Sequence, residues 1–255
     1  GTLEAPDTWE VALSAGADKR ETWERLIAEG KLGALALLRN LRNMQQADVP
    51  ESAIFGALDA MKTDRVLPFR FIAAARAVPQ WEPQIEARML TAMAGGEKLP
   101  GRTLVLVDVS GSMDVALSAK SDMTRMDAAC GVAIVARELC ERVTLAAFSE
   151  KVAILAPRQG FALRDAIVGS MSHSSTYLGQ ALATLEQSQP IPDRLIVITD
   201  EQSHDRVADP QAPSAYMINV ASNQNGVGYG RWTHIDGWSE AVIDFIRECE
   251  RTPAA

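Results

Sequence analysis

The feature that most constrains the fold is an apolar run at residues 103–107, Thr-Leu-Val-Leu-Val, which ends directly on Asp108. A continuous run of β-branched and aliphatic side chains, with no polar alternation, is typical of a strand buried on both faces. Such strands occur in parallel sheets that helices cover on either side. This run therefore predicts a buried strand of an α/β sheet.

Strand and helix patterns alternate along the chain after this run. Further strands are predicted at 143–148, 152–155, 195–199 and, as the last strand, 216–220. Helices are predicted at 123–140, 163–168, 178–186 and 239–247. The alternation predicts an α/β fold with a doubly wound, mostly parallel sheet, which binds ligands at the carboxyl ends of its strands.

The first part of the chain has a different pattern, in which apolar residues recur at three- and four-residue intervals. Helices are predicted at 51–61, at about 66–78 and around 85–93, with prolines near their ends. Short helices with short connections suggest stacked antiparallel pairs, similar to an α-solenoid. The glycine-rich segment 95–101 reads as a linker, so we predict a helical repeat domain at 1–98 and an α/β domain at 99–255.

Bulk properties exclude some classes of protein. The net charge of -8 argues against a chain that coats nucleic acid along its whole length, although a local basic patch remains possible. No apolar run approaches the roughly 18 residues of a membrane span. The first residues lack the features of a signal peptide, and three scattered cysteines fit reduced thiols. We therefore expect a cytoplasmic protein with no membrane partner.

Three polar clusters are predicted at the carboxyl ends of the strands. They are Asp108, Ser110 and Ser112; Ser174-Ser175-Thr176; and Thr199-Asp200-Glu201. Hydroxyl and carboxylate oxygens are the ligands that Mg²⁺ prefers. The alternative is that Asp108 and Ser110 only cap a turn, as these residue types often do. Three such clusters in one sheet favour a metal site.

The pattern Asp108-Val-Ser110-Gly-Ser112, with Thr176 and Asp200 further along, resembles the metal-ion-dependent adhesion site of von Willebrand factor A domains. The resemblance implies that Ser110, Ser112 and Thr176 bind magnesium directly. Asp108 and Asp200 would bind it directly or through water. The expected cofactor is Mg²⁺, with Mn²⁺ or Ca²⁺ able to take its place.

The helical part resembles the end of the TROVE module of Ro ribonucleoproteins. Two blocks carry this resemblance, Ala-Leu-Ala-Leu-Leu-Arg-Asn-Leu-Arg-Asn-Met at 34–44 and Arg-Val-Leu-Pro-Phe-Arg-Phe at 65–71. The segments beginning at Asn219 and His234 also look like bacterial Ro proteins. The resemblance implies small structured RNAs similar to Y RNAs, and single-stranded RNA ends, as partners. A protein partner such as an exoribonuclease is a further expectation.

The charge pattern is compatible with RNA. Residues 31–76 contain seven Lys or Arg against four Asp or Glu. The predicted RNA-binding residues are Lys31, Arg39, Arg42, Arg65 and Arg70. Arginine suits phosphate recognition because its forked donors match phosphate oxygens. The alternative is an ordinary solvated helix face.

These observations leave three functional hypotheses. The first is a non-catalytic RNA-binding component of a ribonucleoprotein. The second is a protein-interaction module whose magnesium captures an acidic side chain of a partner. The third is a metal-dependent hydrolase, for which Glu201 and Asp205 are the nearby candidates; the paired-metal pattern and a positioned general base are missing, so we do not expect an enzyme. His173, His204 and His234 lack zinc-site spacing and are interpreted as surface or hydrogen-bonding residues.

Overall fold

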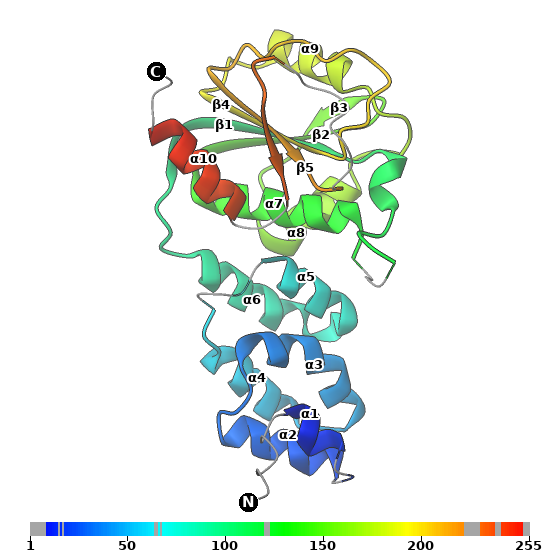
Figure 1. Cartoon of the computed structure of the whole chain (residues 1–255), viewed down its shortest axis with the longest axis vertical. Helices are drawn as coiled ribbons and strands as arrows, with labels where there is room; N and C mark the ends of the chain where they lie inside the picture. Colours follow the sequence, from blue (N-terminus) through cyan, green and yellow to red (C-terminus); the bar gives the residue numbers. More distant parts are fainter. Residues whose placement is uncertain are drawn as a thin grey trace, which may run out of the picture. The chain divides into compact units, whose positions relative to one another are not determined.

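The chain folds into two compact units, Gly1–Ala92 and Met93–Ala255 (Figure 1). The structure, a computed structural model, describes residues 9–14, 16, 18–63, 66, 68–119, 123–221, 230–237 and 241–251. The division predicted at residue 98 falls slightly later, directly before the first strand. Among the described residues, no helix has the length and apolar character needed to cross a bilayer.

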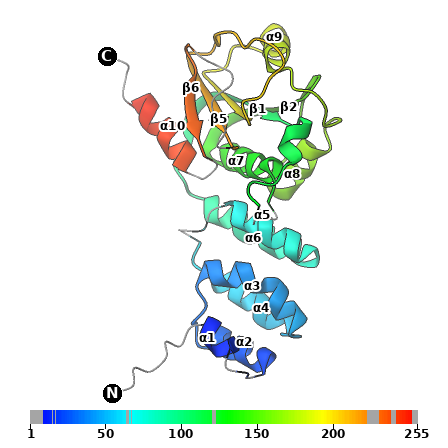
Figure 2. The same cartoon turned by 45° about the vertical axis from the view of Figure 1, so that its right-hand side comes forward.

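The first unit is a stack of short helices. They are α1 (Trp9–Ser14), α2 (Lys19–Ala28), α3 (Ala34–Gln46), α4 (Glu51–Ala60), α5 (Pro68–Ala77), the 3-10 turn η1 (Pro79–Trp81) and α6 (Glu82–Met93). Helix α3 packs against α4 and α5, and α2 packs against α1 and α4 (Figure 2). The buried side chains recur every three or four residues, as in Leu37, Leu41 and Met44 of α3. This arrangement confirms that the first part of the chain is helical.

The second unit is built on a six-stranded sheet. Its strands are β1 (Leu99–Asp108), β2 (Cys140–Phe148), β3 (Val152–Ile154), β4 (Arg194–Thr199), β5 (Ser214–Asn219) and β6 (Thr233–Asp236). They lie in the order β3-β2-β1-β4-β5-β6. All neighbours are parallel except β3, which is antiparallel to β2. The predicted doubly wound, mostly parallel sheet is confirmed.

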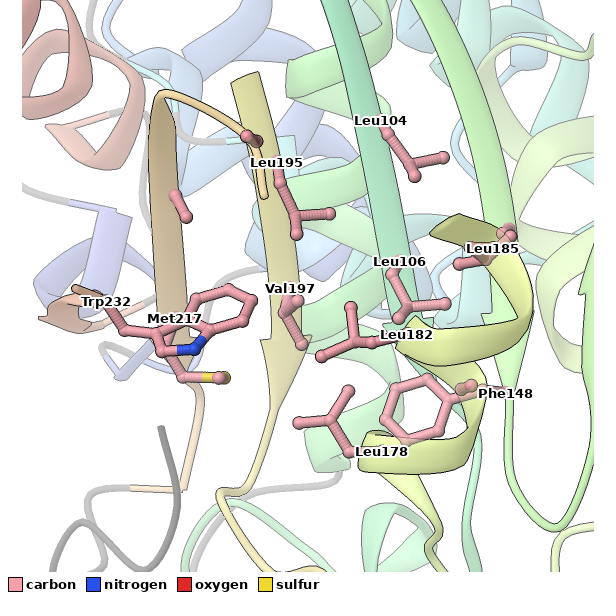
Figure 3. Packing of buried hydrophobic residues seen from close by; sticks show 14 residues of the cluster. Leu104, Leu106, Phe148, Leu178, Leu182, Leu185, Leu195, Val197, Met217 and Trp232 are labelled. Carbon is pink, nitrogen blue, oxygen red and sulfur yellow. The ribbon is translucent and has the colours of Figure 1, made fainter. Parts of the chain in front are cut away.

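Helices cover both faces of this sheet. They are α7 (Arg125–Leu139), α8 (Gly160–Val168), α9 (Leu178–Ser188) and α10 (Ala241–Arg251); the 3-10 turn η2 (Gly111–Asp114) follows β1 and contacts α7. Helix α9 lies on one face, and α7, α8 and α10 lie on the other (Figures 1 and 2). Under α9, Leu178, Leu182 and Leu185 pack on side chains of the sheet that include Leu106 and Val197 (Figure 3). This core explains the uninterrupted apolar runs of β1 and β4, because both of their faces are covered.

Two sheet features differ from the sequence-based prediction. The predicted last strand was 216–220, but β6 pairs with β5 beyond it. Strand β6 is an edge strand of four residues in which only Ile235 is buried and apolar. It therefore lacks the apolar run from which a strand can be predicted. Strand β1 also begins at Leu99, inside the predicted linker, because Leu99 is buried and pairs with Cys140.

A buried arginine attaches the last helix to the sheet. Arg194, at the start of β4, donates hydrogen bonds to the Glu250 carboxylate of α10 through Nε and Nη2, and to the Thr103 hydroxyl at 2.8 Å. The Tyr216 hydroxyl of β5 also donates to Glu250 at 3.2 Å. Three neighbouring strands and α10 are thus joined by one hydrogen-bonded network.

Candidate metal centre

The candidate site lies where the chain order reverses in the sheet. From β1 the chain runs outward to β2 and β3, and it then returns to β4 on the other side of β1. The loops that leave β1 and β4 therefore diverge at their carboxyl ends, which is where doubly wound sheets bind ligands. Asp108 ends β1, and Thr199 and Asp200 follow the buried run of β4. The topology places the first and third polar clusters side by side.

Asp108 joins the two strands through its buried carboxylate. One oxygen, Oδ1, accepts the backbone N–H of Ser110 at 2.8 Å, and Oδ2 accepts the Thr199 hydroxyl at 2.7 Å. Burial raises the pKa of Asp108 to about 6, against the opposing effect of the hydrogen bonds from Ser110 and Thr199. The hydrogen bond from the Ser110 N–H shows that Asp108 does cap a turn, as the alternative interpretation of the sequence expected. A cation close to this buried carboxylate would in addition stabilise its charged form.

The hydroxyl cluster comes from two loops that a backbone bond holds together. The Ser110 and Ser112 hydroxyls lie 3.3 Å apart, and the intervening Gly111 N–H donates to the Ser174 carbonyl at 2.9 Å. This bond brings the loop that carries Thr176 against η2. Thr176 is buried, and within the described residues its hydroxyl forms no hydrogen bond.

The third loop adds Asp200, whose charge is already paired. Its Oδ2 accepts Arg125 Nη1 at 2.9 Å, and the same nitrogen donates to the Ser112 carbonyl at 3.4 Å. Asp200 is fully buried, whereas the Arg125 side chain is 17% exposed. Arg125 is the first residue of α7 and lies inside the capping box that Thr124 and Asp127 form at the start of this helix. Arg125 was not predicted from the sequence, because nothing in the residues around an arginine in the first turn of a helix indicates its distant ion-pair partner.

Three histidines surround this centre, and each forms hydrogen bonds. His173 Nδ1 bonds the Asp114 carboxylate at 2.9 Å, and His234 Nδ1 bonds the Glu201 carboxylate at 2.8 Å. His204 Nδ1 lies 3.1 Å from the Thr176 carbonyl oxygen, to which the His204 backbone N–H also donates at 2.9 Å. Their interpretation as hydrogen-bonding residues is confirmed, and their position beside the site was not foreseen.

The donor set fits a hard cation. Among the described residues, no three His, Cys, Asp or Glu side chains come together as a metal site, so a metal here would depend on hydroxyl oxygens. Ser110, Ser112 and Thr176 offer three such oxygens, and Asp108 and Asp200 offer two buried carboxylates. Oxygen ligands of this kind suit Mg²⁺ and do not suit zinc, which prefers nitrogen and sulfur.

Asp205 and Glu201, the carboxylates considered for a hydrolase, already pair with groups of the protein. The two carboxylate oxygens of Asp205 accept the N–H groups of Gly179 and Gln180, the first turn of α9, at 3.0 and 2.8 Å. Asp205 therefore caps a helix. Glu201 is buried with a positive φ of 60° and pairs with His234.

The predicted RNA-binding residues divide into three groups. Arg39 and Arg42 are exposed on α3, and Arg42 Nε donates to the Ala77 carbonyl at the end of α5 at 3.4 Å. Arg76, the residue before Ala77 in α5, is also exposed; we call Arg39, Arg42 and Arg76 the α3–α5 basic patch. Lys31 pairs with Glu29 at 2.9 Å, and the Arg70 guanidinium lies over the Phe69 ring, 4.7 Å from its centroid. Arg65 lies outside the described residues.

The capped start of α9 predicts a glycine requirement at residue 179. A Cβ added to Gly179 would lie 2.2 Å from the Arg206 carbonyl oxygen, so Gly179→Ala should displace the loop that holds Thr176 and destabilise the chain by about 1–3 kcal/mol. Thermal unfolding measures the loss, and hydrogen exchange should rise at 174–180 and 203–206. Gly56→Ala in α4, which meets no atom within 4 Å, should instead be neutral or stabilising. Equal behaviour of the two variants would contradict this packing.

Comparison with known proteins places the chain in a family. The TROVE domain model matches residues 2–158, a span that runs from the helical unit past Asp108, Ser110 and Ser112. Telomerase protein component 1 of Mus musculus is 34% identical over 92 residues, covering 34% of this chain and 4% of that protein, and the Rattus norvegicus protein is 33% identical over 92 residues with the same coverage.

A crystal structure of the Deinococcus radiodurans RO (RSR) protein superposes with a TM-score of 0.64 at 20% identity. The superposition covers 91% of this chain and 54% of that chain, so this chain spans about half of that protein and a small part of the telomerase proteins. The likeness extends over both units described above. On the family match, which covers more than half of its residues, the chain belongs to the TROVE domain family.

Proposed function

We propose that the chain is part of a non-catalytic, Ro-like RNA-binding protein that acts as a ribonucleoprotein component. The family match carries this proposal, and the superposition with the RO (RSR) protein supports it at the level of the fold. The RNAs would be small structured RNAs similar to Y RNAs, together with single-stranded RNA ends. A protein partner such as an exoribonuclease would act on RNA presented by the complex.

The α3–α5 basic patch is the proposed phosphate contact of the helical unit. Arg39 and Arg42 are three residues apart on one exposed helix face, and exposed Arg76 precedes Ala77, whose carbonyl accepts Arg42 Nε. Arginine donors contact phosphates without reading sequence. Lys31 and Arg70 remain candidates, each already in contact with a neighbouring side chain.

The double variant Arg39→Glu with Arg42→Glu tests this patch. Binding of a fluorescent hairpin RNA with a single-stranded tail should weaken at least tenfold, and the slope of log K against log salt should fall by about 2, because two phosphate contacts are lost. Fluorescence anisotropy across a salt series measures both quantities. The control Arg20→Glu with Arg25→Glu makes the same charge change on exposed positions of α2. If both double variants bind RNA equally, the patch is wrongly assigned.

In the α/β unit we propose a Mg²⁺ site. Ser110, Ser112 and Thr176 would bind the ion directly, and Asp108 and Asp200 directly or through water. The bound ion would supply an electrophilic centre for an acidic ligand, since most of these donors are neutral hydroxyls.

Removal of two hydroxyls tests the metal proposal. Ser112→Ala with Thr176→Val keeps the volume of the site nearly constant and should lower Mg²⁺ affinity at least tenfold, because two oxygen ligands are lost. Isothermal titration calorimetry with MgCl₂ provides the measurement. Ser188→Ala with Thr184→Val makes the same two changes on the exposed side of α9 and should leave the affinity unchanged. Undiminished Mg²⁺ binding by the first variant would refute the ligand set.

Arg125 sets the affinity of the proposed site. Its guanidinium occupies Asp200 Oδ2 at 2.9 Å, so a cation near that carboxylate must compete with a fixed positive charge. Arg125→Gln should therefore tighten Mg²⁺ binding by about tenfold or more. Arg137→Gln, further along α7, is the control. Weaker Mg²⁺ binding in Arg125→Gln would mean that Arg125 instead holds Asp200 in place for the ion.

A second candidate function is metal-dependent capture of an acidic side chain from a partner protein. Two features favour this function: the proposed metal ligands are mostly neutral hydroxyls, and the charge of Asp200 is already paired with Arg125. The positive charge of a metal ion held in this way is little neutralised by the protein, so the ion attracts an acidic ligand from outside. Asp108→Ala, or EDTA, should then abolish capture of the partner in a pull-down and leave RNA affinity unchanged. Loss of RNA binding in Asp108→Ala would show that the two activities are not separate.

A further inference from the structure

A second hollow of the α/β unit lies at the opposite ends of the strands from the candidate metal centre. It has a volume of about 270 Å³ and is lined by residues that include Arg102 and Leu104 of β1, Arg142 and Thr144 of β2, and Pro190 and Pro192. Helix α9 ends at Ser188, and Gln189, the next residue, also lines the cavity, so α9 ends at its edge. The helix that covers the rest of this face therefore leaves these four strand residues beside an open cavity.

Two arginines that line this cavity lie next to each other on β1 and β2. Arg102 and Arg142 are partners in the register of β1 and β2, so their side chains leave the same face of neighbouring strands, which lie about 4.8 Å apart. Like charges directly opposite each other on neighbouring strands are destabilising. Arg102 Nη2 donates to the Ile191 carbonyl at 3.1 Å, whereas Arg142 forms no ion pair or hydrogen bond with any described residue.

The carboxylates near these arginines already accept hydrogen bonds from backbone N–H groups. Asp193 Oδ2 accepts the backbone N–H of Arg102 at 2.7 Å, and this hydrogen bond, aided by the charges of Arg102, Arg142 and Arg194, lowers the pKa of Asp193. Glu141 accepts the Gly101 N–H at 2.9 Å, and strand alternation directs its side chain to the face opposite that of Arg142. Neither carboxylate lines the cavity, so its walls carry two guanidinium groups and no acid.

We propose that this cavity binds a phosphate group, in particular that of a nucleotide. The forked donors of Arg102 and Arg142 match phosphate oxygens, and the Thr144 hydroxyl adds a further donor from the same wall. Leu104, Pro190 and Pro192 form an apolar wall against which a ribose or base can pack. The two prolines restrict the backbone of this loop, so the wall is preformed.

Isothermal titration calorimetry of the whole chain at low salt tests the proposal with three ligands. Uridine 5′-monophosphate should bind, inorganic phosphate should bind more weakly through the same arginines, and uridine should not bind. Arg142→Gln should reduce the affinity for the nucleotide at least tenfold, since a charge-assisted contact is lost. Arg158→Gln removes an exposed arginine that does not line the cavity and should have no effect. Circular dichroism establishes that each variant is folded.

Other results would overturn the phosphate pocket. Equal binding of uridine and its monophosphate would show that the cavity does not read phosphate. Equal losses in Arg142→Gln and Arg158→Gln would show only a general effect of net charge. A second cavity variant, Arg102→Gln, should repeat the loss seen in Arg142→Gln, and unchanged nucleotide affinity in both would place the binding elsewhere. Since the test uses no Mg²⁺ and no RNA, its failure would leave the proposed function standing.

Discussion

The structure of the α/β unit depends on one buried carboxylate at the point where the sheet reverses its order. Asp108 has no exposed surface, and its two oxygens accept the Ser110 N–H and the Thr199 hydroxyl. A buried charge of this kind is tolerated only when it is fully hydrogen-bonded or close to a cation. The same bonds set the start of the Ser110–Ser112 loop and join β1 to β4. The hydrogen bonds that shape the proposed metal site thus also hold the two central strands in position.

Much of this fold follows from the sequence because its signals are local. Residues 103–107 and 195–198 are continuous apolar runs, so their burial and strand character are visible without the structure. The placement of Asp108 and Asp200 at one edge then follows from parallel pairing alone. Strand β6 escaped prediction because an edge strand with one buried apolar residue has no pattern of its own. Two contacts could not be predicted for another reason. The Arg125–Asp200 pair joins residues 75 positions apart, and the Asp205 cap of α9 joins residues 26 positions apart. Pairing over such separations depends on the fold.

The two ends of the sheet differ in chemistry for a structural reason. At the carboxyl ends, loops fold over the strands and bury Asp108, Thr199 and Asp200, which leaves a site of oxygen atoms balanced by one arginine. At the amino ends, α9 stops short, and two in-register arginines remain beside an open cavity. In our proposals, one end of the sheet therefore binds a cation and the other end binds an anion.

The most direct test of the central claim is a crystal structure of the chain grown with Mn²⁺, with anomalous diffraction measured to locate the ion. The account predicts an anomalous peak bounded by the hydroxyls of Ser110, Ser112 and Thr176, with the Arg125 guanidinium moved away from Asp200 or separated from the ion by water. Absence of a peak there at saturating Mn²⁺, with Arg125 still paired to Asp200, would contradict it. In that case the hydrogen bonds of Asp108 would serve only to hold β1 and β4 together.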